Sequence, residues 1–321
     1  MKKVIKKESK KVSKKKVLVT GVGGPAGINV SKLFAGYKKD FLVHGCDINK
    51  NSAGKFFVSI FALAPRVTEE EKYLKWMKLY INKNKIDILI PTVAEELVLM
   101  LKLQTLVPNT KIIVSEHKVL ELCDHKNKLY SWMDKNFPEY MGKWAEVEKV
   151  NFNFEHYFIK PVKGRGSRGV RKVTRRELEF LQVEKSTETF LAMEVLPGKE
   201  WTVDVYINED GTFAYVVPRL RLQMSGGISQ IGQTDKNKQV IKQTKEVLEK
   251  LNRESKLWGP VFIQWKQAED GSIKMVEINP RASGGLTITA LAGANPIECL
   301  KHEIFGPSNC NNIKWNTVTV T

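Results

Sequence analysis

The sequence lacks most of the features that assign a protein quickly. Its 321 residues contain no run of 18 apolar residues, so we expect no membrane span. The N-terminus has no apolar signal core, and a cytoplasmic protein is therefore expected. Only four cysteines occur, far apart and without a Cys-x-x-Cys pair, which indicates free thiols in a reducing compartment. The five histidines show no metal-ligand spacing.

Acidic residues are also fewer than basic ones. The sequence has 35 aspartates and glutamates and 52 lysines and arginines, which gives a net charge of +17. The first sixteen residues hold nine lysines and one glutamate, which is nearly half of that excess. We interpret residues 1–15 as a basic, disordered tail that makes at most non-specific contacts with nucleic acid. A nucleic-acid-binding protein is the alternative, although no RNA- or DNA-binding motif accompanies the charge.

Strands and helices alternate along residues 16–115. Lys16–Thr20 has the pattern of a short buried strand, and the glycine-rich turn Gly21–Gly27 and a helix at Ile28–Gly36 follow it. Four further strands are predicted at Leu42–Asp47, Phe56–Ala64, Ile86–Pro91 and Lys111–Val114, and helical spacing at Glu69–Asn82 and Glu95–Leu106 separates the last three. This alternation predicts a parallel, doubly wound sheet of the α/β class.

The glycine-rich turn and Asp47 allow two interpretations. An NAD(P)-dependent reductase would bind its dinucleotide at this turn and a ribose at Asp47. Alternatively, the glycines only form the tight turn that a helix needs after a buried strand, which is the interpretation that we favour. Thr92, Glu95 and Glu96 follow the fourth strand at its carboxyl end, where ligands of open α/β sheets bind. Helix capping explains these three residues almost as well.

Two strand-like runs flank Asp270-Gly271, which is a strong hairpin signal. With these two residues as the loop, Gln264 lies directly opposite Glu277, and Asn279 joins the same face. Two amides and a carboxylate offer oxygen ligands that suit Mg²⁺, with phosphate oxygens completing the shell. A polar, solvent-facing surface is the alternative. We expect the other face to lie in the core, with Ile263, Trp265, Val276 and Ile278.

A second Asp-Gly pair, Asp210-Gly211, predicts another hairpin. Its register places Glu200 opposite Arg221 and Thr202 opposite Arg219, on a face that also carries Asp204. A β-bulge in strands of this length would shift the register. The face could bind a ligand, or it could carry only cross-strand ion pairs on a solvated sheet.

A basic, glycine-rich loop follows the predicted strand Tyr157–Pro161. The strand ends with Lys160, and Gly164, Gly166 and Gly169 alternate with cations in the loop. Glycines let the backbone fold closely over an anion, and the cations would neutralise it. The loop is not a Walker P-loop, since Gly-Lys-Ser/Thr is absent. A simple basic hairpin turn is the alternative.

The order and spacing of these motifs resemble ATP-grasp ligases, and among them the large subunit of carbamoyl-phosphate synthetase and shorter stand-alone proteins. The resemblance runs from Lys16 to about Gly306. It implies a mixed α/β and α+β protein with a Rossmann-like pre-ATP-grasp domain at 16–115 and an ATP-grasp domain at 116–306. The latter would comprise a lid at about 127–195 and an antiparallel-sheet body, and residues 307–321 would be a C-terminal extension.

The resemblance also implies roles for individual residues. Lys126, with Lys128 as a rival, and Lys160 would hold phosphates, although His125 stands where the family more often has Asp. The lid loop would contribute Gly164, Arg165, Gly166 and Ser167. The backbone of Glu194, Val195 and Leu196 would contact adenine, and Glu200 would accept the ribose hydroxyls. Gln264, Glu277 and Asn279 would bind metal, and Arg281, with Arg219 or Arg221, would hold the γ-phosphate or the acid.

The implied activity is ATP-dependent ligation with Mg²⁺, or Mn²⁺ as an alternative metal. A small-molecule carboxylate would become an acyl phosphate, and an amine or another nucleophile would displace phosphate, with release of ADP. Full carbamoyl-phosphate synthetase activity is not expected, since that enzyme has two ATP-grasp halves and a glutaminase partner. A homodimer is compatible with this reading.

Overall fold

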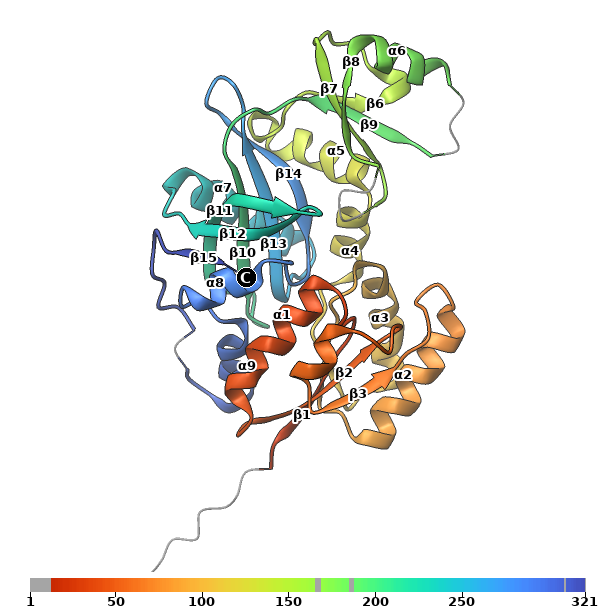
Figure 1. The fold of residues 1–321 in the computed structure, drawn as a ribbon, viewed down its shortest axis with the longest axis vertical. Helices are drawn as coiled ribbons and strands as arrows, with labels where there is room; N and C mark the ends of the chain where they lie inside the picture. Colours follow the sequence, from red (N-terminus) through yellow and green to blue (C-terminus); the bar gives the residue numbers. More distant parts are fainter. Residues whose placement is uncertain (1–12, 165–168, 185–187, 309, 321) are drawn as a thin grey trace, which may run out of the picture.

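The computed structural model describes residues 13–164, 169–184, 188–308 and 310–320, and they form three sheets (Figure 1). The expected disordered tail therefore lies largely outside the described residues. Lys15 is an exception, because it begins the first strand and forms an ion pair with Asp87 at 3.2 Å. Within the described part of the chain, no helix is long and apolar enough to cross a membrane.

The N-terminal sheet is parallel, with strand order β3-β2-β1-β4-β5. Helix α1 (Pro25–Phe34) packs against one face, and α2 (Glu70–Asn84) and α3 (Leu97–Leu106) against the other. The sheet is therefore doubly wound, as the alternation predicts. Its strands are β1 (Lys15–Val19), β2 (Phe41–Asp47), β3 (Ile60–Leu63), β4 (Ile88–Ile90) and β5 (Lys111–Ile112).

The apolar run Phe56–Ala64 forms less strand than its composition predicts. Residues Ala53–Phe57 form a 3-10 turn, and only Ile60–Leu63 pairs with β2. Phe56 is 78% exposed, so this part of the run is not in the core. The prediction failed here because Gly54 packs against the carbonyl of Val22, which fixes the turn ahead of the strand.

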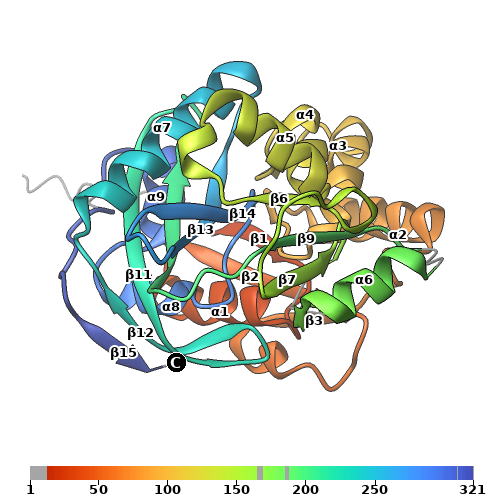
Figure 2. The same ribbon diagram turned by 90° about the horizontal axis from the view of Figure 1, so that it is seen from above.

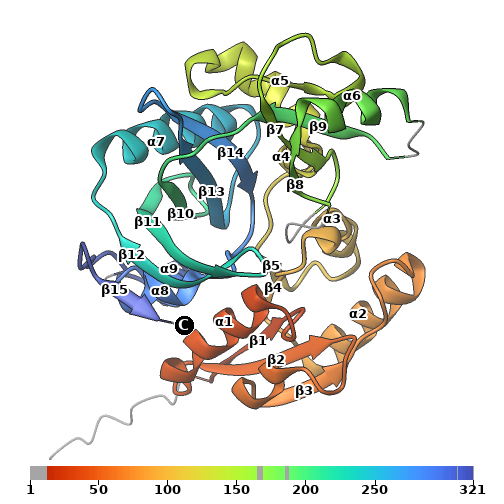
Figure 3. The ribbon, with the colours of Figure 1, turned by 45° about the horizontal axis from the view of Figure 1, so that its top comes forward.

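A four-stranded sheet of order β6-β9-β7-β8 lies at the opposite end of the molecule from the N-terminal sheet (Figures 1 and 3). Helices α4 (His117–Asp124) and α5 (Lys126–Asn136) lead into it from the N-terminal domain, and α6 (Arg175–Val183) packs on it. The four strands are β6 (Trp144–Glu146), β7 (His156–Pro161), β8 (Arg171–Thr174) and β9 (Phe190–Glu194).

The third sheet has six antiparallel strands in the order β14-β13-β10-β11-β12-β15. Helix α7 (Lys238–Glu254) covers the face away from the four-stranded sheet (Figure 2). Helices α8 (Leu286–Leu291) and α9 (Pro296–Phe305) follow the last hairpin strand. The strands are β10 (Glu200–Ile207), β11 (Phe213–Ser225), β12 (Ile228–Thr234), β13 (Gly259–Gln267), β14 (Ile273–Asn279) and β15 (Val318–Val320).

Both predicted hairpin registers are correct where the polar residues lie. Gln264 pairs with Glu277, and Thr202 pairs with Arg219. Each turn is one residue longer than the two-residue loop that the sequence predicts, since Ala268 N–H bonds to the carbonyl of Ser272 and Asn208 N–H to that of Thr212. A register shift further along each hairpin restores the predicted pairing.

The shift in the β13–β14 hairpin changes which residues reach the core. Ile263, Trp265 and Ile278 are fully buried, as predicted. Val276 is only partly buried, whereas Met275 pairs with Trp265 and is fully buried. The expectation for Val276 was wrong because the β-bulge turns this residue out of the alternation.

Candidate active site

One row of cross-strand neighbours crosses the inner face of the six-stranded sheet. Glu277 on β14 pairs with Gln264 on β13, Gln264 pairs with Thr202 on β10, and Thr202 pairs with Arg219 on β11. Asn279 pairs with Phe262, two residues along from Gln264. The opposite face packs on α7, and the polar residues therefore collect on the side that faces the other two sheets. The structure thus brings together the three predicted metal ligands.

The bulge at Val276 presents its carbonyl oxygen to two buried side chains. Tyr130 Oη donates to it at 2.6 Å and Lys160 Nζ at 3.1 Å. Lys160 is only 4% exposed, and its ammonium lies 4.8 Å from the centre of the Tyr130 ring. Burial lowers the pKa of Lys160 to about 7, although the carboxylate of Glu277 opposes this shift. Lys160 is therefore a buried amine next to the row of polar residues, and it forms no ion pair with the residues that the structure describes.

The contacts distinguish Lys126 from its rival Lys128. Lys126 Nζ donates to the carbonyl of Gly164 at 2.9 Å, at the start of the glycine-rich loop. Burial lowers the pKa of Lys126, and Glu277 and Asp124 oppose this effect. Lys128, by contrast, forms a half-exposed ion pair with Glu121 at 2.6 Å. The geometry therefore places Lys126, rather than Lys128, near Lys160 and Glu277.

The segment predicted to contact the nucleotide base and ribose joins β9 to β10. The Glu194 amide donates to the carbonyl of Lys143 at 3.0 Å, and Leu196 is buried, while Val195 lies between them. The carboxylate of Glu200 forms ion pairs with Arg221 and, at 3.5 Å, with Lys266. The cross-strand ion pair predicted as one alternative is therefore present. Arg165, Gly166 and Ser167 of the lid loop lie outside the described residues.

Arg219 is almost completely buried and is held on three sides. Its Nε donates to Asp204 Oδ2 at 2.8 Å, and its Nη2 donates to Ser283 Oγ at 3.1 Å. The guanidinium lies against Gly285, where a Cβ atom would come within 2.9 Å of it. Its Nη1 has no hydrogen-bond partner among the described residues. The sequence placed Arg219 and Asp204 on one face but did not predict this burial.

Arg281 lies just beyond β14, after Asn279 and Pro280. Its guanidinium carbon lies 5.2 Å from the centre of the Phe262 ring, and Nη1 donates to the carbonyl of Ala282 at 3.0 Å. A guanidinium on an aromatic face is stabilised there while its remaining N–H groups can meet other partners. Arg281 is thus fixed next to the row of polar residues.

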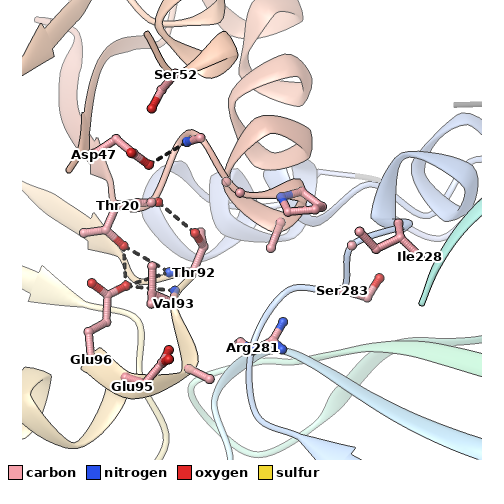
Figure 4. Close-up of a pocket in the computed structure, with 18 of the residues that line it drawn as sticks. Thr20, Asp47, Ser52, Thr92, Val93, Glu95, Glu96, Ile228, Arg281 and Ser283 are labelled. Atoms are coloured by element: carbon pink, nitrogen blue, oxygen red, sulfur yellow. Dashed lines mark hydrogen bonds between the residues drawn. The ribbon is translucent and has the colours of Figure 1, made fainter. Parts of the chain in front are cut away.

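A cavity of about 810 Å³ separates this sheet from the N-terminal domain (Figure 4). Five predicted site residues line it, namely Gln264, Glu277, Arg281, Arg219 and Arg221. Lys126, Lys160 and Glu200 do not line it. Lys160 instead bonds to the carbonyl just before Glu277. Glu277 therefore stands between the cavity and the buried lysines.

The N-terminal wall of the cavity is formed by the glycine-rich turn and by the residues after β4. Glu96 is fully buried and accepts hydrogen bonds from Thr20, from Tyr73 and from the amides of Thr92 and Val93. Burial raises its pKa in spite of these donors. Glu96 therefore holds together the turn that follows β4, as the capping interpretation predicts. Both Glu95 and Glu96 line the cavity.

Asp47 is used to hold the glycine-rich turn. Its Oδ2 accepts from the Gly23 amide at 2.7 Å, and its Oδ1 accepts from the Asn49 amide at 2.9 Å. A Cβ atom on Gly23 would lie 2.5 Å from Ser52 Oγ, so the Ser52 side chain packs closely against this glycine. The arrangement gives no support to the dinucleotide-binding alternative.

Sequence reasoning missed several residues that shape the site. Tyr130 shares the Val276 carbonyl with Lys160, and Asn29 of α1 donates to the carbonyl of Gly284 at 2.7 Å. The latter bond ties the N-terminal domain to the loop that follows Arg281. The glycine-rich composition of that loop was the one signal in the sequence, and it identified neither partner.

Comparison with known proteins agrees with this geometry. A family described as "ATP-grasp in the biosynthetic pathway with Ter operon" matches residues 186–319. No curated protein matches the sequence.

Solved structures resemble the whole chain. An L-amino acid ligase from Bacillus licheniformis is 16% identical with a TM-score of 0.67, and the match covers 91% of this chain and 74% of that one. N5-carboxyaminoimidazole synthetase from Staphylococcus aureus, complexed with ADP, is 13% identical with a TM-score of 0.71, covering 97% and 81%. A biotin carboxylase complex from Campylobacter jejuni is 12% identical with a TM-score of 0.68, covering 95% and 74%. The chain therefore has the ATP-grasp fold, and the matching family supports its place in the ATP-grasp superfamily.

Proposed function

We propose that this protein is an ATP-dependent, ADP-forming ligase that joins a small-molecule carboxylate to an amine or another nucleophile. One observation carries the proposal. The Gln264–Glu277 pair lines a large cavity on one side and stands next to the buried lysine Lys160 on the other. A nucleotide held by the lysines would then direct its terminal phosphate toward a substrate in the cavity.

The chemistry of the buried lysines supports an anionic ligand. Burial lowers the pKa of both Lys126 and Lys160, and the carboxylate of Glu277 opposes the shift in each case. A phosphate chain would supply the missing negative charge and would stabilise both ammonium groups. We therefore assign Lys126 and Lys160 to the phosphates and leave Lys128 on the surface.

The residues present also fit a Mg²⁺ ion. Among the residues that the structure describes, no group of three or more His, Cys, Asp or Glu side chains could hold a metal alone. Glu277, Gln264 and Asn279 provide one carboxylate and two amide oxygens, which suits an ion that takes its other ligands from phosphate and water. When bound, Mg²⁺ would offset the charge of the triphosphate. Mn²⁺ has similar ligand preferences, and we include it as an alternative.

The proposed reaction has two steps. An oxygen of the substrate carboxylate attacks the γ-phosphorus, and the bond to the β-phosphate oxygen breaks, which gives an acyl phosphate and ADP. The nucleophile then attacks the acyl carbon, phosphate leaves with the bonding electrons, and an attacking amine releases a proton. The protein would act mainly by positioning the groups and by neutralising charge.

We propose that the arginines that line the cavity bind the anionic groups of the substrates. Arg281 lines the cavity beside Glu277, and Arg219 presents Nη1 without a partner among the described residues. Either could hold the γ-phosphate or the carboxylate. Arg221 already pairs with Glu200 and is the weaker choice. We also propose that Glu200 binds the ribose, and that the backbone of Glu194, Val195 and Leu196 contacts the base. The loop that begins at Gly164 would act as a lid over the nucleotide. A relationship to carbamoyl-phosphate synthetase is likewise a proposal.

The test of this function is the release of ADP from Mg-ATP in the presence of paired carboxylates and amines. Glu277→Ala should abolish turnover while the circular dichroism spectrum stays unchanged, because the variant loses the only carboxylate among the proposed metal ligands. Glu269→Ala, in the turn of the same hairpin and exposed, is the matched control and should retain turnover. Near-normal turnover in Glu277→Ala would refute the metal assignment.

A further inference from the structure

Two of the four cysteines meet near the C-terminal end of the chain. Cys299 lies on α9, and its fully buried side chain belongs to an apolar cluster with Tyr206 and Tyr215. Cys310 packs against the same cluster from the segment that follows α9, and it is partly exposed. Both cysteines are free thiols. The fold therefore places two thiols in one cluster, although eleven positions separate them along the chain.

Hydrogen bonds on both sides of the second cysteine fasten its segment to α9. Before it, Ser308 Oγ donates to the carbonyl of Glu298 at 2.7 Å, on the turn of α9 that also carries the buried cysteine. After it, the amide of Asn312 donates to the carbonyl of Gly293 at 3.2 Å, just ahead of α9. A Cβ atom on Gly293 would lie 1.9 Å from the Asn312 carbonyl oxygen, so this contact is close. The two anchors hold Cys310 against the first turns of α9.

The two thiols have different acidities, because one donates a hydrogen bond to the other. This bond from the Cys299 thiol lowers the pKa of Cys310 to about 7, although burial and the carboxylate of Glu298 oppose the shift. Burial raises the pKa of Cys299 far above its usual range, and Cys310 raises it further. Near pH 7 about half of Cys310 is therefore thiolate, which is the nucleophilic form of cysteine. A partly exposed thiolate beside a protonated thiol is the arrangement of an attacking and a resolving cysteine.

The other two cysteines have a different environment. Cys46 lies in the core of the N-terminal domain, and Cys123 packs against the core beneath the six-stranded sheet. Neither belongs to the cluster that holds the pair. Burial raises the pKa of Cys46 well above its usual value and that of Cys123 to about 12. Both should therefore react slowly, and they provide controls within the same chain.

We propose that Cys310 and Cys299 form a dithiol site that a hydroperoxide oxidises to a disulfide. The Cys310 thiolate attacks one oxygen of hydrogen peroxide, the O–O bond breaks and hydroxide leaves, which gives a sulfenic acid. The Cys299 sulfur then attacks the sulfenic sulfur, the S–O bond breaks, and the hydroxyl leaves as water with the thiol proton. Two thiols are thus oxidised while one peroxide is reduced. A small thiol reverses the reaction by exchange.

The disulfide would link α9 covalently to the segment that carries β15. Beyond Cys310, the amide of Asn316 donates to the carbonyl of Thr234 at 2.8 Å, and β15 then pairs with β12. Two residues of β12, Ile228 and Ser229, line the cavity of the candidate active site. The modification site therefore acts on the edge of the sheet that forms this cavity, and it does not depend on the ligase function proposed above.

Peptide mapping after peroxide treatment tests the site. The full chain is treated with hydrogen peroxide at pH 7, alkylated with N-ethylmaleimide and digested without reductant, and the monomer fraction is analysed by mass spectrometry. We expect a linked pair of peptides that joins Cys299 to Cys310, lighter than the two thiol peptides by two hydrogen atoms and separated by dithiothreitol. Cys46 and Cys123 should remain available for alkylation once the protein is unfolded. The absence of the linked peptides, at a peroxide dose that oxidises any of the four cysteines, would overturn the proposal.

Substitutions separate the attacking cysteine from the resolving one. Cys299→Ser should leave a sulfenic acid on Cys310, which dimedone traps, whereas Cys310→Ser should leave Cys299 reduced. Cys123→Ser is the matched control and should not change the yield of disulfide. In the wild type, Cys310 should react with iodoacetamide at least about tenfold faster than Cys123. Equal rates for these two cysteines would contradict the assignment of Cys310 as the attacking thiol, and this comparison needs no variant to fold.

Discussion

Lys160 donates a hydrogen bond of 3.1 Å to the carbonyl oxygen of Val276, the residue immediately before Glu277. The bond exists because β14 carries a β-bulge at this position, which turns the carbonyl out of the ladder toward the lysine. The same irregularity leaves Glu277 opposite Gln264. A single bulge therefore sets the positions of both a phosphate-binding candidate and a metal-binding candidate.

Replacement of Lys160 should stabilise the protein in a pH-dependent way. Burial lowers its pKa from 10.5 to about 7, so the unfolded chain binds more protons than the folded chain between these values. Stability contributed by this group therefore rises with pH across that window, and the cost of burying the charge is fully present below about pH 7. Lys160→Met should raise the free energy of unfolding by about 2 to 4 kcal/mol at about pH 6.

Urea denaturation of wild type and Lys160→Met across this pH range measures the effect. The difference between the two proteins should shrink toward zero as the pH approaches about 10. Lys128→Met, at a half-exposed lysine, is the control and should change stability little at any pH. A gain for Lys160→Met that did not vary with pH would contradict the assignment of its cause to buried charge.

The two candidate phosphate lysines should differ in their effect on nucleotide affinity. Lys126→Ala removes a charged donor next to the glycine-rich loop and should raise the Kd for Mg-ATP by about 10- to 100-fold. Lys128→Ala removes only a surface ion pair and should change the Kd less than about twofold. Isothermal titration calorimetry measures both values. Equal losses in the two variants would show that the contacts do not identify the phosphate ligand.

Asp204 should be essential for stability because it neutralises Arg219 in the core. Both side chains are 2% exposed, and Asp204 Oδ2 also accepts from Thr289 Oγ1 at 2.5 Å. Asp204→Asn leaves the guanidinium without its counter-charge and should cost about 3 to 5 kcal/mol of unfolding free energy. Unfolding in denaturant measures this loss.

A double variant separates the structural role of this pair from its role in activity. Asp204→Leu combined with Arg219→Met removes both charges and should recover most of the stability that Asp204→Asn loses. It should still bind Mg-ATP but should lose ligase turnover, since the cavity then lacks its preformed anion contact. Full turnover in the double variant would show that Arg219 is a structural residue alone.

The hairpins show how far the sequence could predict the site. The Asp-Gly signals located both turns within one residue, and the pairings Gln264–Glu277 and Thr202–Arg219 were correct. They were correct because a longer turn and a bulge offset each other in each hairpin. No residue type marks the bulge at Val276, so the sequence could not predict the contact that Lys160 makes there.

Burial at the site was harder to predict than pairing. A strand pattern assigns Arg219 to one face of the sheet. How deeply its side chain is buried depends on Ser283 and Gly285, which lie more than 60 positions further along the chain. The role of Asp47 depends in the same way on tertiary packing, which brings its carboxylate to the amide of Gly23, 24 positions earlier in the chain. Local patterns therefore located the candidate residues, while non-local packing determined which of them are structural.

Lys160 and its neighbours should bind Mg-ATP, and a thermal shift compared across Mg-ATP, NADH and NADPH tests this binding most directly. A ligand at about one hundred times its Kd stabilises a protein by about 2.7 kcal/mol, which is readily measured. We expect a rise in melting temperature with Mg-ATP that is lost in Lys160→Ala. A rise with NADPH alone would contradict it and would move the site to the glycine-rich turn at Gly21–Gly27.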